Sequence, residues 1–355
     1  MRYIRSAMVV ISAAAVVSLV AFLVSCGGGG GGGGTTSTDV DNSRASGTYS
    51  FVLMNGAMDV MIGTATFNGA GSGTYVVTSP TTTSGTFTYV AKVDNSLVID
   101  GTSVGSLRNG GSFFAVVDVV SGEEQMMVGV KQSVVSEAAT TYISGQFSYD
   151  YVAGIAEANI IQINTATPSA GNGTFSALAG YITGTGTFTY TFDPTKGTIS
   201  LPTPTTAADT FGAVTSDRQL MIMGDGETAS TSEVGGTVGL KQPSVAMSNA
   251  SLNGTYLLYN IADENAGGIP FYVTSRARAT FDGAGHGTFT ELAISSGTPV
   301  STVTITYAVT ANGELSFNGN GAKERGTVLE DGSVFSMIYF APGDNYASLG
   351  VGIKQ

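Results

Sequence analysis

The sequence is poor in the residues on which most catalytic, metal and redox sites depend. Its 355 residues include one cysteine, one histidine and no tryptophan. A single cysteine forms no disulfide within the chain, and a single histidine cannot supply both a catalytic base and a histidine-rich metal site. We therefore predict no catalytic residue, no metal and no cofactor, and we expect stability to come from sheets and an apolar core.

Charged residues are also scarce, at 11% of the chain, and basic residues are the scarcer kind, with 14 Lys and Arg against 26 Asp and Glu. A protein that binds nucleic acid needs a basic surface to meet the phosphates. The charge balance therefore excludes nucleic acid as a partner.

Long apolar stretches are missing after the first 26 residues, since no later stretch approaches the roughly 20 apolar residues of a spanning helix. Before that point a basic start and a nearly unbroken apolar run end in the sequence LVSC at Cys26. This segment resembles the lipobox of bacterial lipoproteins. The resemblance implies that residues 1–25 are a signal peptide and that Cys26 carries the lipid. The alternatives are an ordinary secretory signal and a membrane anchor.

A glycine tract from Gly27 to Gly34 follows, and polar residues continue it to Ala45. This composition cannot bury enough apolar surface to fold. Residues 26–45 are therefore predicted to be the lipidated cysteine and a flexible tether, which would span about 25 Å on average. Gly27 stands where inner-membrane lipoproteins have Asp, so the segment resembles the outer-membrane class. That implies a lipid anchor in the bacterial outer membrane, facing the periplasm or the outside.

One five-residue phrase closes three successive stretches of the chain. It reads VGVKQ, VGLKQ and VGIKQ, and the three closings are 110 and 113 residues apart. Each stretch also opens on a glycine that is followed two residues later by an aromatic residue: Gly47/Tyr49, Gly145/Phe147 and Gly254/Tyr256. A period of about 100 residues corresponds to a small domain. The sequence predicts one domain repeated three times, over residues 46–132, 144–242 and 253–355.

Each repeat has the pattern of short β-strands. Val, Ile, Thr, Phe and Tyr alternate with polar residues, and Asn-Gly and Asp-Gly turns separate the runs. The third repeat divides into eight segments: 254–261, 270–281, 287–296, 300–310, 313–318, 322–329, 333–341 and 345–354. Short connections predict an antiparallel meander, and closure into an up-and-down barrel would remove its exposed edges. We therefore predict an all-β chain of three tandem eight-stranded barrels, with β-sandwiches as the alternative.

The fourth segment of each repeat has one bulky face and one threonine face. Phe188, Tyr190 and Phe192, for example, alternate with Thr187, Thr189 and Thr191. In a barrel surrounded by water the aromatic face points inward, whereas in a membrane barrel it points toward lipid. Alternation alone does not choose between the two, although several segments of about five residues are shorter than the 9–11 residues of a spanning strand.

The openings and closings of the repeats resemble the calycins, the lipocalin and avidin group of small meander barrels. In those families a basic residue of the last strand packs across an aromatic ring of the first strand. The resemblance implies three closing pairs: Tyr49 with Lys131, Phe147 with Lys241, and Tyr256 with Lys354. This chain departs from the family by having no tryptophan in the opening motif.

Two motifs could indicate catalysis, and both have a plainer explanation. Residues 101–105 match the Gly-x-Ser-x-Gly elbow of hydrolases around Ser103, but a turn follows where that elbow needs a helix. His286 lies in a glycine-rich hairpin, and the corresponding hairpin of the first repeat has Ser72 at that position.

Acidic residues are the remaining candidates. Asp39 and Asp41 begin like a calcium loop, but Arg44 stands where that loop needs glycine. Three acidic pairs are expected to be solvated turns: Glu123-Glu124, Asp263-Glu264 and Glu330-Asp331.

The sequence favours a non-catalytic, lipid-anchored protein of the cell envelope. Such a protein would bind a small apolar ligand inside a barrel, or would serve a structural or adhesive role with an envelope partner. Small eight-stranded barrels either fill with side chains or hold one small ligand. Two alternatives stay open, an outer-membrane pore or transport component and an envelope hydrolase of unknown type.

Overall fold

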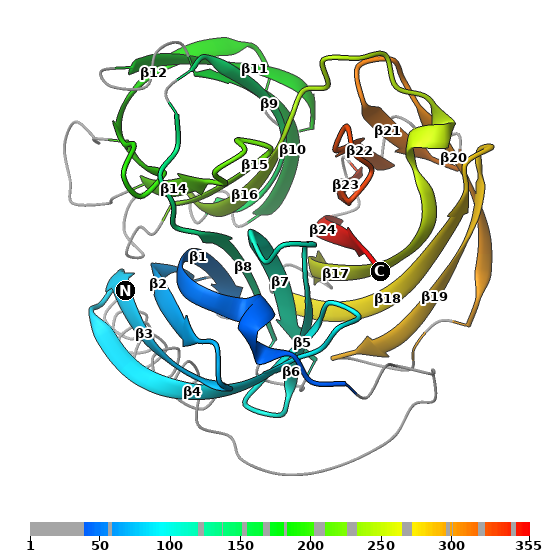
Figure 1. Cartoon of the computed structure of the whole chain (residues 1–355). Coiled ribbons are helices and arrows are strands. Elements are labelled where there is room, and N and C mark those ends of the chain that lie inside the picture. The colour runs from blue at the N-terminus through cyan, green and yellow to red at the C-terminus, as the bar shows by residue number, and fades with distance from the viewer. Residues whose placement is uncertain are drawn as a thin grey trace, which may run out of the picture.

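The computed structural model is all-β and contains three closed antiparallel barrels of eight strands each (Figure 1). This confirms the predicted fold over the sandwich alternative, because the first and last strands of each barrel are paired. The structure describes the following residues: 39–55, 59–119, 124–136, 138–150, 155–165, 171–180, 183–201, 210–225, 233–264, 272–295, 299, 301–318, 324–341 and 346–355. The predicted signal peptide, Cys26 and the glycine tract lie outside these residues.

The strands follow one another around each barrel in sequence order. The first barrel consists of β1 (Ser46–Asn55), β2 (Val60–Asn68), β3 (Ser72–Ser79), β4 (Thr83–Ala91), β5 (Ser96–Ile99), β6 (Ser103–Leu107), β7 (Phe113–Asp118) and β8 (Gln125–Lys131). The second consists of β9 (Thr140–Asp150), β10 (Ile155–Thr165), β11 (Gly171–Gly180), β12 (Thr185–Asp193), β13 (Thr198–Leu201), β14 (Thr210–Val214), β15 (Leu220–Asp225) and β16 (Glu233–Lys241). The third consists of β17 (Asn253–Glu264), β18 (Tyr272–Asp282), β19 (His286–Ile294), β20 (Val303–Val309), β21 (Glu314–Phe317), β22 (Glu324–Val328), β23 (Val334–Ala341) and β24 (Tyr346–Lys354).

The end of the predicted tether belongs to the first barrel. Val40 forms a β-bridge with Lys92, and a short 3-10 helix, η1 (Asn42–Ala45), lies across the end of the barrel. The side chain of Asn42 accepts a hydrogen bond from the backbone N–H of Ala91 at 2.9 Å. The expectation of a flexible tether is therefore wrong for residues 39–45, because their polar groups are bound to the barrel wall. A second 3-10 helix, η3 (Asn249–Ser251), precedes β17 in the same way.

The aromatic face of each barrel points inward. In the first barrel Phe87 and Tyr89 on β4 are 4% and 3% exposed. Thr86, which precedes Phe87, and Thr88, which lies between the two rings, are exposed. This is the orientation of a barrel that faces water and the reverse of a barrel that faces lipid. Within the described part of the chain, no helix has the length and apolar character needed to span a membrane.

Aromatic rings fill the interiors of the first and third barrels. Phe67 lies 5.2 Å from Tyr49, 4.9 Å from Phe87 and 4.9 Å from Tyr89, measured between ring centroids. Phe281 has the corresponding place in the third barrel, where it contacts Tyr256, Tyr307, Phe317 and Phe335. Edge-to-face contacts at these separations stabilise a core beyond the area that they bury.

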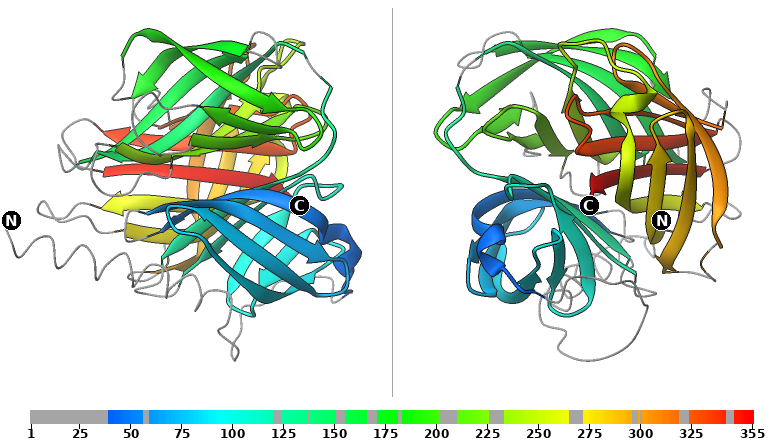
Figure 2. Two further views of the ribbon diagram at one scale, coloured as in Figure 1. Left: turned by 90° about the vertical axis from the view of Figure 1, so that its left-hand side faces the viewer. Right: turned by 45° about the vertical axis from the view of Figure 1, so that its right-hand side comes forward.

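The largest described cluster of buried apolar side chains lies between the barrels and not inside one of them. All three barrels contribute to it, for example through Val128, Leu240 and Val351. Figures 1 and 2 show the three barrels gathered around this common centre, with β7, β8, β16 and β24 facing it. The barrels therefore share one core and form a single body.

This shared core explains the repeated closing phrase. Val128 and Val130 on β8 point outward into the shared core, while Gly129 between them lies against the ring of Phe114 inside the barrel. Because β-strand side chains alternate, Lys131 also points toward the inside, at the end of the barrel. One face of the closing phrase is therefore apolar and packs in the core between the barrels. The other face carries glycine and lysine and points into the barrel.

Candidate functional site

Arg108 lies where the three barrels meet. It follows β6 in the first barrel, and its side chain is only 9% exposed. Its Nη1 is 2.9 Å from a carboxylate oxygen of Asp217 in the second barrel, and its Nη2 is 2.9 Å from one of Asp331 in the third. Its Nε donates to the hydroxyl of Ser333 at 3.1 Å. We call Arg108, Asp217 and Asp331 the Arg108 bridge.

The electrostatics of the Arg108 bridge favour its charged state. Partial burial works to raise the pKa of Asp217, but hydrogen bonds from Thr215, Gln219 and Arg108 outweigh it and hold that pKa below its usual value. The pKa of Asp331 is lowered in the same way, against the effect of burial, by bonds from Ser333 and Arg108. Burial disfavours the guanidinium, yet the two carboxylates raise the pKa of Arg108.

The sequence analysis did not find Arg108, and it predicted Glu330-Asp331 to be only a solvated turn. A partial signal was present, because the three residues occupy the same hairpin of their repeats, between the sixth and seventh strands. Within that hairpin Asp217 and Asp331 share one position, three residues before the seventh strand, and Arg108 lies two residues before the corresponding Gly110. A position-by-position alignment places Thr215 and Leu329 opposite Arg108, so only the tertiary structure shows that the three charges meet.

The first and third barrels bring the predicted closing residues together. Lys131 pairs with Tyr49 across β8 and β1, and Lys354 pairs with Tyr256 across β24 and β17. The Nζ of Lys354 lies 5.9 Å from the centroid of the Tyr256 ring. Each tyrosine is fully buried, which raises its pKa, and its hydroxyl donates to a backbone carbonyl, of Gly111 and of Gly332, at 2.6 Å in both barrels.

The glycine of the opening motif makes room for this lysine. Gly47 has a φ of 104°, and a Cβ added there would lie 2.8 Å from Cε of Lys131. Gly254 has a φ of 111°, and a Cβ would lie 2.9 Å from Cε of Lys354. Both the backbone conformation and the space therefore require glycine.

The predicted pair in the second barrel is wrong. Lys241 pairs with Tyr142, and Phe147 lies five residues farther along β9, opposite Gly236. Phe147 points out of the barrel, into the shared core, and contacts Tyr272 with ring centroids 6.1 Å apart. The prediction failed because Gly145 and Phe147 have the spacing of the opening motif by coincidence. The residues that correspond to Gly47 and Tyr49 are Thr140 and Tyr142.

The other candidate residues are not gathered into one site. Ser103 is buried on β6 of the first barrel, where its hydroxyl is 3.4 Å from Asp118. His286 is exposed in a hairpin of the third barrel, with Nδ1 3.5 Å from Asp282. Asp41 accepts a bond from the hydroxyl of Ser43 at 2.5 Å. Across the described ranges, His, Cys, Asp and Glu form no group that could hold a metal ion.

The three acidic pairs also have separate environments. Asp263 is fully buried between the barrels. Glu330 accepts hydrogen bonds from the backbone and the hydroxyl of Ser244 at 2.6 and 2.9 Å, and its neighbour Asp331 belongs to the Arg108 bridge. Glu123 lies outside the described residues.

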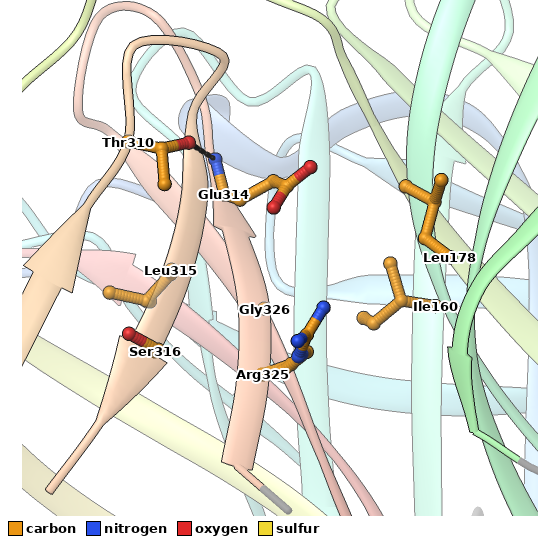
Figure 3. A pocket seen from close by; sticks show the side chains of 8 residues that line it. All are labelled: Ile160, Leu178, Thr310, Glu314, Leu315, Ser316, Arg325 and Gly326. Carbon is orange, nitrogen blue, oxygen red and sulfur yellow. Dashed lines mark hydrogen bonds between the residues drawn. The ribbon is translucent and has the colours of Figure 1, made fainter. Parts of the chain in front are cut away.

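A cleft of about 170 Å³ separates the second and third barrels. Figure 3 shows Glu314 and Arg325 of the third barrel on one wall and Ile160 and Leu178 of the second on the other. The backbone N–H of Glu314 donates to Thr310 at 3.2 Å, which fixes the start of β21. The cleft therefore combines an acid, a guanidinium and two aliphatic side chains within a small volume.

Comparison with known proteins gives a likeness to solved structures alone. No protein-family model matches the chain, and no curated protein sequence matches it. A variant of transferrin binding protein B from Haemophilus parasuis is similar at 8% identity and a TM-score of 0.29, over 82% of this chain and 65% of that one. Intact Ap-TbpB, with its N and C lobes, is similar at 8% identity and a TM-score of 0.30, over 84% and 66%. The chain thus spans slightly less than two thirds of the length of these structures.

Proposed function

We propose that this chain is a non-catalytic, lipid-anchored protein of the bacterial outer membrane whose three barrels act as one rigid binding body. The buried core shared by all three barrels is the observation that supports this proposal most strongly. Independent barrels on linkers would each present their own outer wall to water. Here the outer walls of the three barrels pack against one another, and the Arg108 bridge forms ion pairs between the first barrel and each of the other two.

Binding is proposed to take place on the outer surface of this body. Rings fill the first and third barrels, so these two interiors leave little space for the small apolar ligand that the sequence suggested. The cleft between the second and third barrels is smaller than the roughly 300–1,000 Å³ of pockets that enclose whole ligands. It suits one projecting group of a larger envelope partner, with an apolar end toward Ile160 and a polar end toward Arg325.

The inward aromatic faces favour this function over the outer-membrane pore. A pore needs an apolar band on the outside of its barrel. The outer faces of β3 and β4 instead carry exposed residues such as Thr74 and Thr86. The hydrolase alternative loses support because Ser103 and His286 lie in different barrels.

Replacing Cys26 with serine is expected to abolish incorporation of radioactive palmitate into the protein. Residues 27–355, exported behind a cleavable secretory signal, should then be recovered in the soluble fraction without detergent. The reason is that the lipid would be the attachment to the membrane, while the barrels turn polar faces outward. Absence of label in the unchanged protein would contradict the lipid anchor, and a membrane-bound 27–355 fragment would favour the pore.

We also propose that the closing pairs hold the ends of the first and third barrels together. Lys354→Met keeps the aliphatic stem over Gly254 but removes the charge over Tyr256. It is expected to lower the free energy of unfolding by about 0.5–1 kcal/mol, the usual strength of a cation over an aromatic ring near solvent. Urea denaturation measures this, with Lys196→Met as an exposed control. Equal effects of the two substitutions would show that the charge over the ring adds nothing.

A further inference from the structure

One end of the second barrel is closed differently from the same end of the other two. In the first and third barrels a 3-10 helix lies across this end, η1 before β1 and η3 before β17. The residue two positions before the seventh strand is a glycine in both barrels, Gly111 and Gly332. A Cβ on Gly111 would overlap the backbone of Arg44, and a Cβ on Gly332 would overlap that of Ser251. The helix therefore leaves no room for a side chain at this position.

Arg218 occupies this position in the second barrel. Its φ of 53° lies in the same left-handed region as the φ of 65° at Gly111 and of 66° at Gly332, so the three hairpins turn alike. The described residues before β9, which are 133–136 and 138–139, form no helix. The second barrel therefore has an arginine side chain at the position where the other two have glycine beneath a helix.

A cavity of about 20 Å³ lies at this end of the second barrel, and Arg218 is one of the residues that line it. Apolar side chains such as Phe192 and Ile199 form part of the lining. Four further residues of the lining carry hydroxyl groups: Thr140, Tyr142, Thr165 and Tyr190. The cavity thus combines one cation with several hydroxyls in an otherwise apolar setting.

One of these hydroxyls has a different partner in the other barrels. Tyr190 is the counterpart of Tyr89 and Tyr307, because each lies two residues beyond the partner of a glycine in the third strand. The hydroxyls of these counterparts donate to the backbone of the 3-10 helix, Tyr89 to Asn42 and Tyr307 to Asn249, at 3.2 Å in both barrels. In the second barrel the corresponding phenol lines the cavity.

Arg218 brings to this cavity a charge that no described carboxylate neutralises. The residue is partly buried, and its Nη1 is buried without a hydrogen-bond partner among the described residues. The carboxylate of the neighbouring Asp217 is already bound to Arg108, at 2.9 Å. Burial raises the pKa of Tyr142, and a hydrogen bond with Thr140 and the charge of Arg218 partly offset this rise. The guanidinium therefore lies near the phenol of Tyr142.

We propose that this cavity binds a monatomic anion, a halide such as chloride. The guanidinium of Arg218 supplies the positive charge and the charge-assisted hydrogen bonds. The phenol O–H groups of Tyr142 and Tyr190 can rotate to donate to the same ion. The bound ion would close this end of the second barrel, as η1 and η3 close the other two.

Size and charge together select this class of ligand. A cavity of about 20 Å³ holds one particle of the size of a water molecule, and it excludes phosphate, sulfate and organic acids. A water molecule would accept a hydrogen bond from the guanidinium but would leave its charge unpaired. Because a buried charge is unfavourable unless it is paired, a monatomic anion fits this cavity better than water does.

This site goes beyond the proposed function and is independent of it. It lies at the end of one barrel, whereas the cleft proposed for a partner lies between the second and third barrels. Absence of palmitate labelling would leave the anion site unaffected, and absence of chloride binding would leave the anchor and the cleft unaffected.

The test uses the full chain in a detergent without halide, with sodium chloride as the probe and sodium gluconate to keep the ionic strength constant. Chloride is expected to raise the unfolding midpoint by about 2 °C relative to gluconate. The protein should also broaden the chloride NMR line, and Arg218→Met should reduce that broadening at least about fivefold, since it removes the cation of the cavity. In gluconate the midpoint of Arg218→Met should stay level or rise, because the unpartnered buried nitrogen is gone.

Arg278→Met is the matched control, because Arg278 is exposed on the outside of β18 and its loss should leave both chloride effects unchanged. Tyr190→Phe is a second variant, which keeps the ring, removes one hydroxyl from the cavity and should weaken the Kd for chloride about fivefold. Crystals grown in sodium bromide should show an anomalous scattering peak beside the guanidinium of Arg218.

Three results would overturn the proposal. The first is a chloride response of Arg218→Met equal to that of Arg278→Met. The second is an unchanged protein that neither broadens the chloride line nor gains stability from chloride. The third is bromide on the outer surface with none in the cavity, which would mean an adventitious ion only.

Discussion

Replacing Phe335 with alanine should cost about 3–5 kcal/mol of folding free energy, as for other large aromatic residues removed from a core. Phe335 is 1% exposed, and its ring centroid lies 5.3 Å from that of Tyr256 and 5.6 Å from that of Phe281. It also lies over Gly352, the glycine of the third closing phrase. The substitution therefore removes ring contacts and opens a space beside the strand that closes the barrel. Urea denaturation followed by tyrosine fluorescence measures the loss.

The glycine beneath this ring gives a matched test. A Cβ on Gly352 would overlap the ring of Phe335, so Gly352→Ala alone should cost about 1–3 kcal/mol through overpacking. In the double variant the ring is absent and the methyl group has room. The double variant should therefore be more stable than the sum of the two single effects predicts. Strict additivity would show that glycine is needed there for another reason.

Replacing Arg108 with methionine should lower the free energy of unfolding by about 2 kcal/mol. Hydrogen bonds between charged groups contribute roughly 1.5–3 kcal/mol, and we discount them because the carboxylates of Asp217 and Asp331 are half-exposed. Since the bridge joins all three barrels, we also expect the unchanged protein to unfold in one calorimetric transition and Arg108→Met to unfold in a broader or split one. Differential scanning calorimetry measures both effects.

The same variant should change the acid response of the protein. Asp217 and Asp331 have pKa values below their usual range when folded, so their stabilisation is complete above the unfolded pKa of about 3.9. It is lost as the pH falls from there through the folded values. Arg108→Met should therefore lose less stability on acidification than the unchanged protein. In the Arg108→Met background, changing both aspartates to asparagine should have little further effect, and a full additional loss would contradict the bridge.

Local sequence pattern was a good guide to the strands. In the third repeat every segment predicted from alternation and turn residues corresponds to an observed strand, because hairpin turns and side-chain alternation are properties of neighbouring residues. The sequence pattern also identified the opening glycine of the first and third barrels. The structure explains why glycine is needed there, because the side chain of Lys131 or Lys354 lies beside Gly47 or Gly254.

Pattern failed where a residue's partner lies far away in the sequence. Phe147 matched the opening motif, but it belongs to the surface that joins the barrels, and Tyr142 has the position next to Lys241. Residues 39–45 looked like tether, since nothing nearby in sequence shows that Asn42 bonds to Ala91. In the sequence Arg108 is a single charged residue in a turn. Only the tertiary structure shows that aspartates of the other two barrels lie beside it.

The sequence alone determined the number of repeats, their all-β character and their antiparallel order, because these follow from periodicity and short connections. Only the tertiary structure decided which face of each strand points inward, since alternation is the same for a barrel in water and a barrel in lipid. It also decided that the three barrels share one core. An apolar outward face on β8, β16 and β24 becomes a buried face only when another barrel covers it.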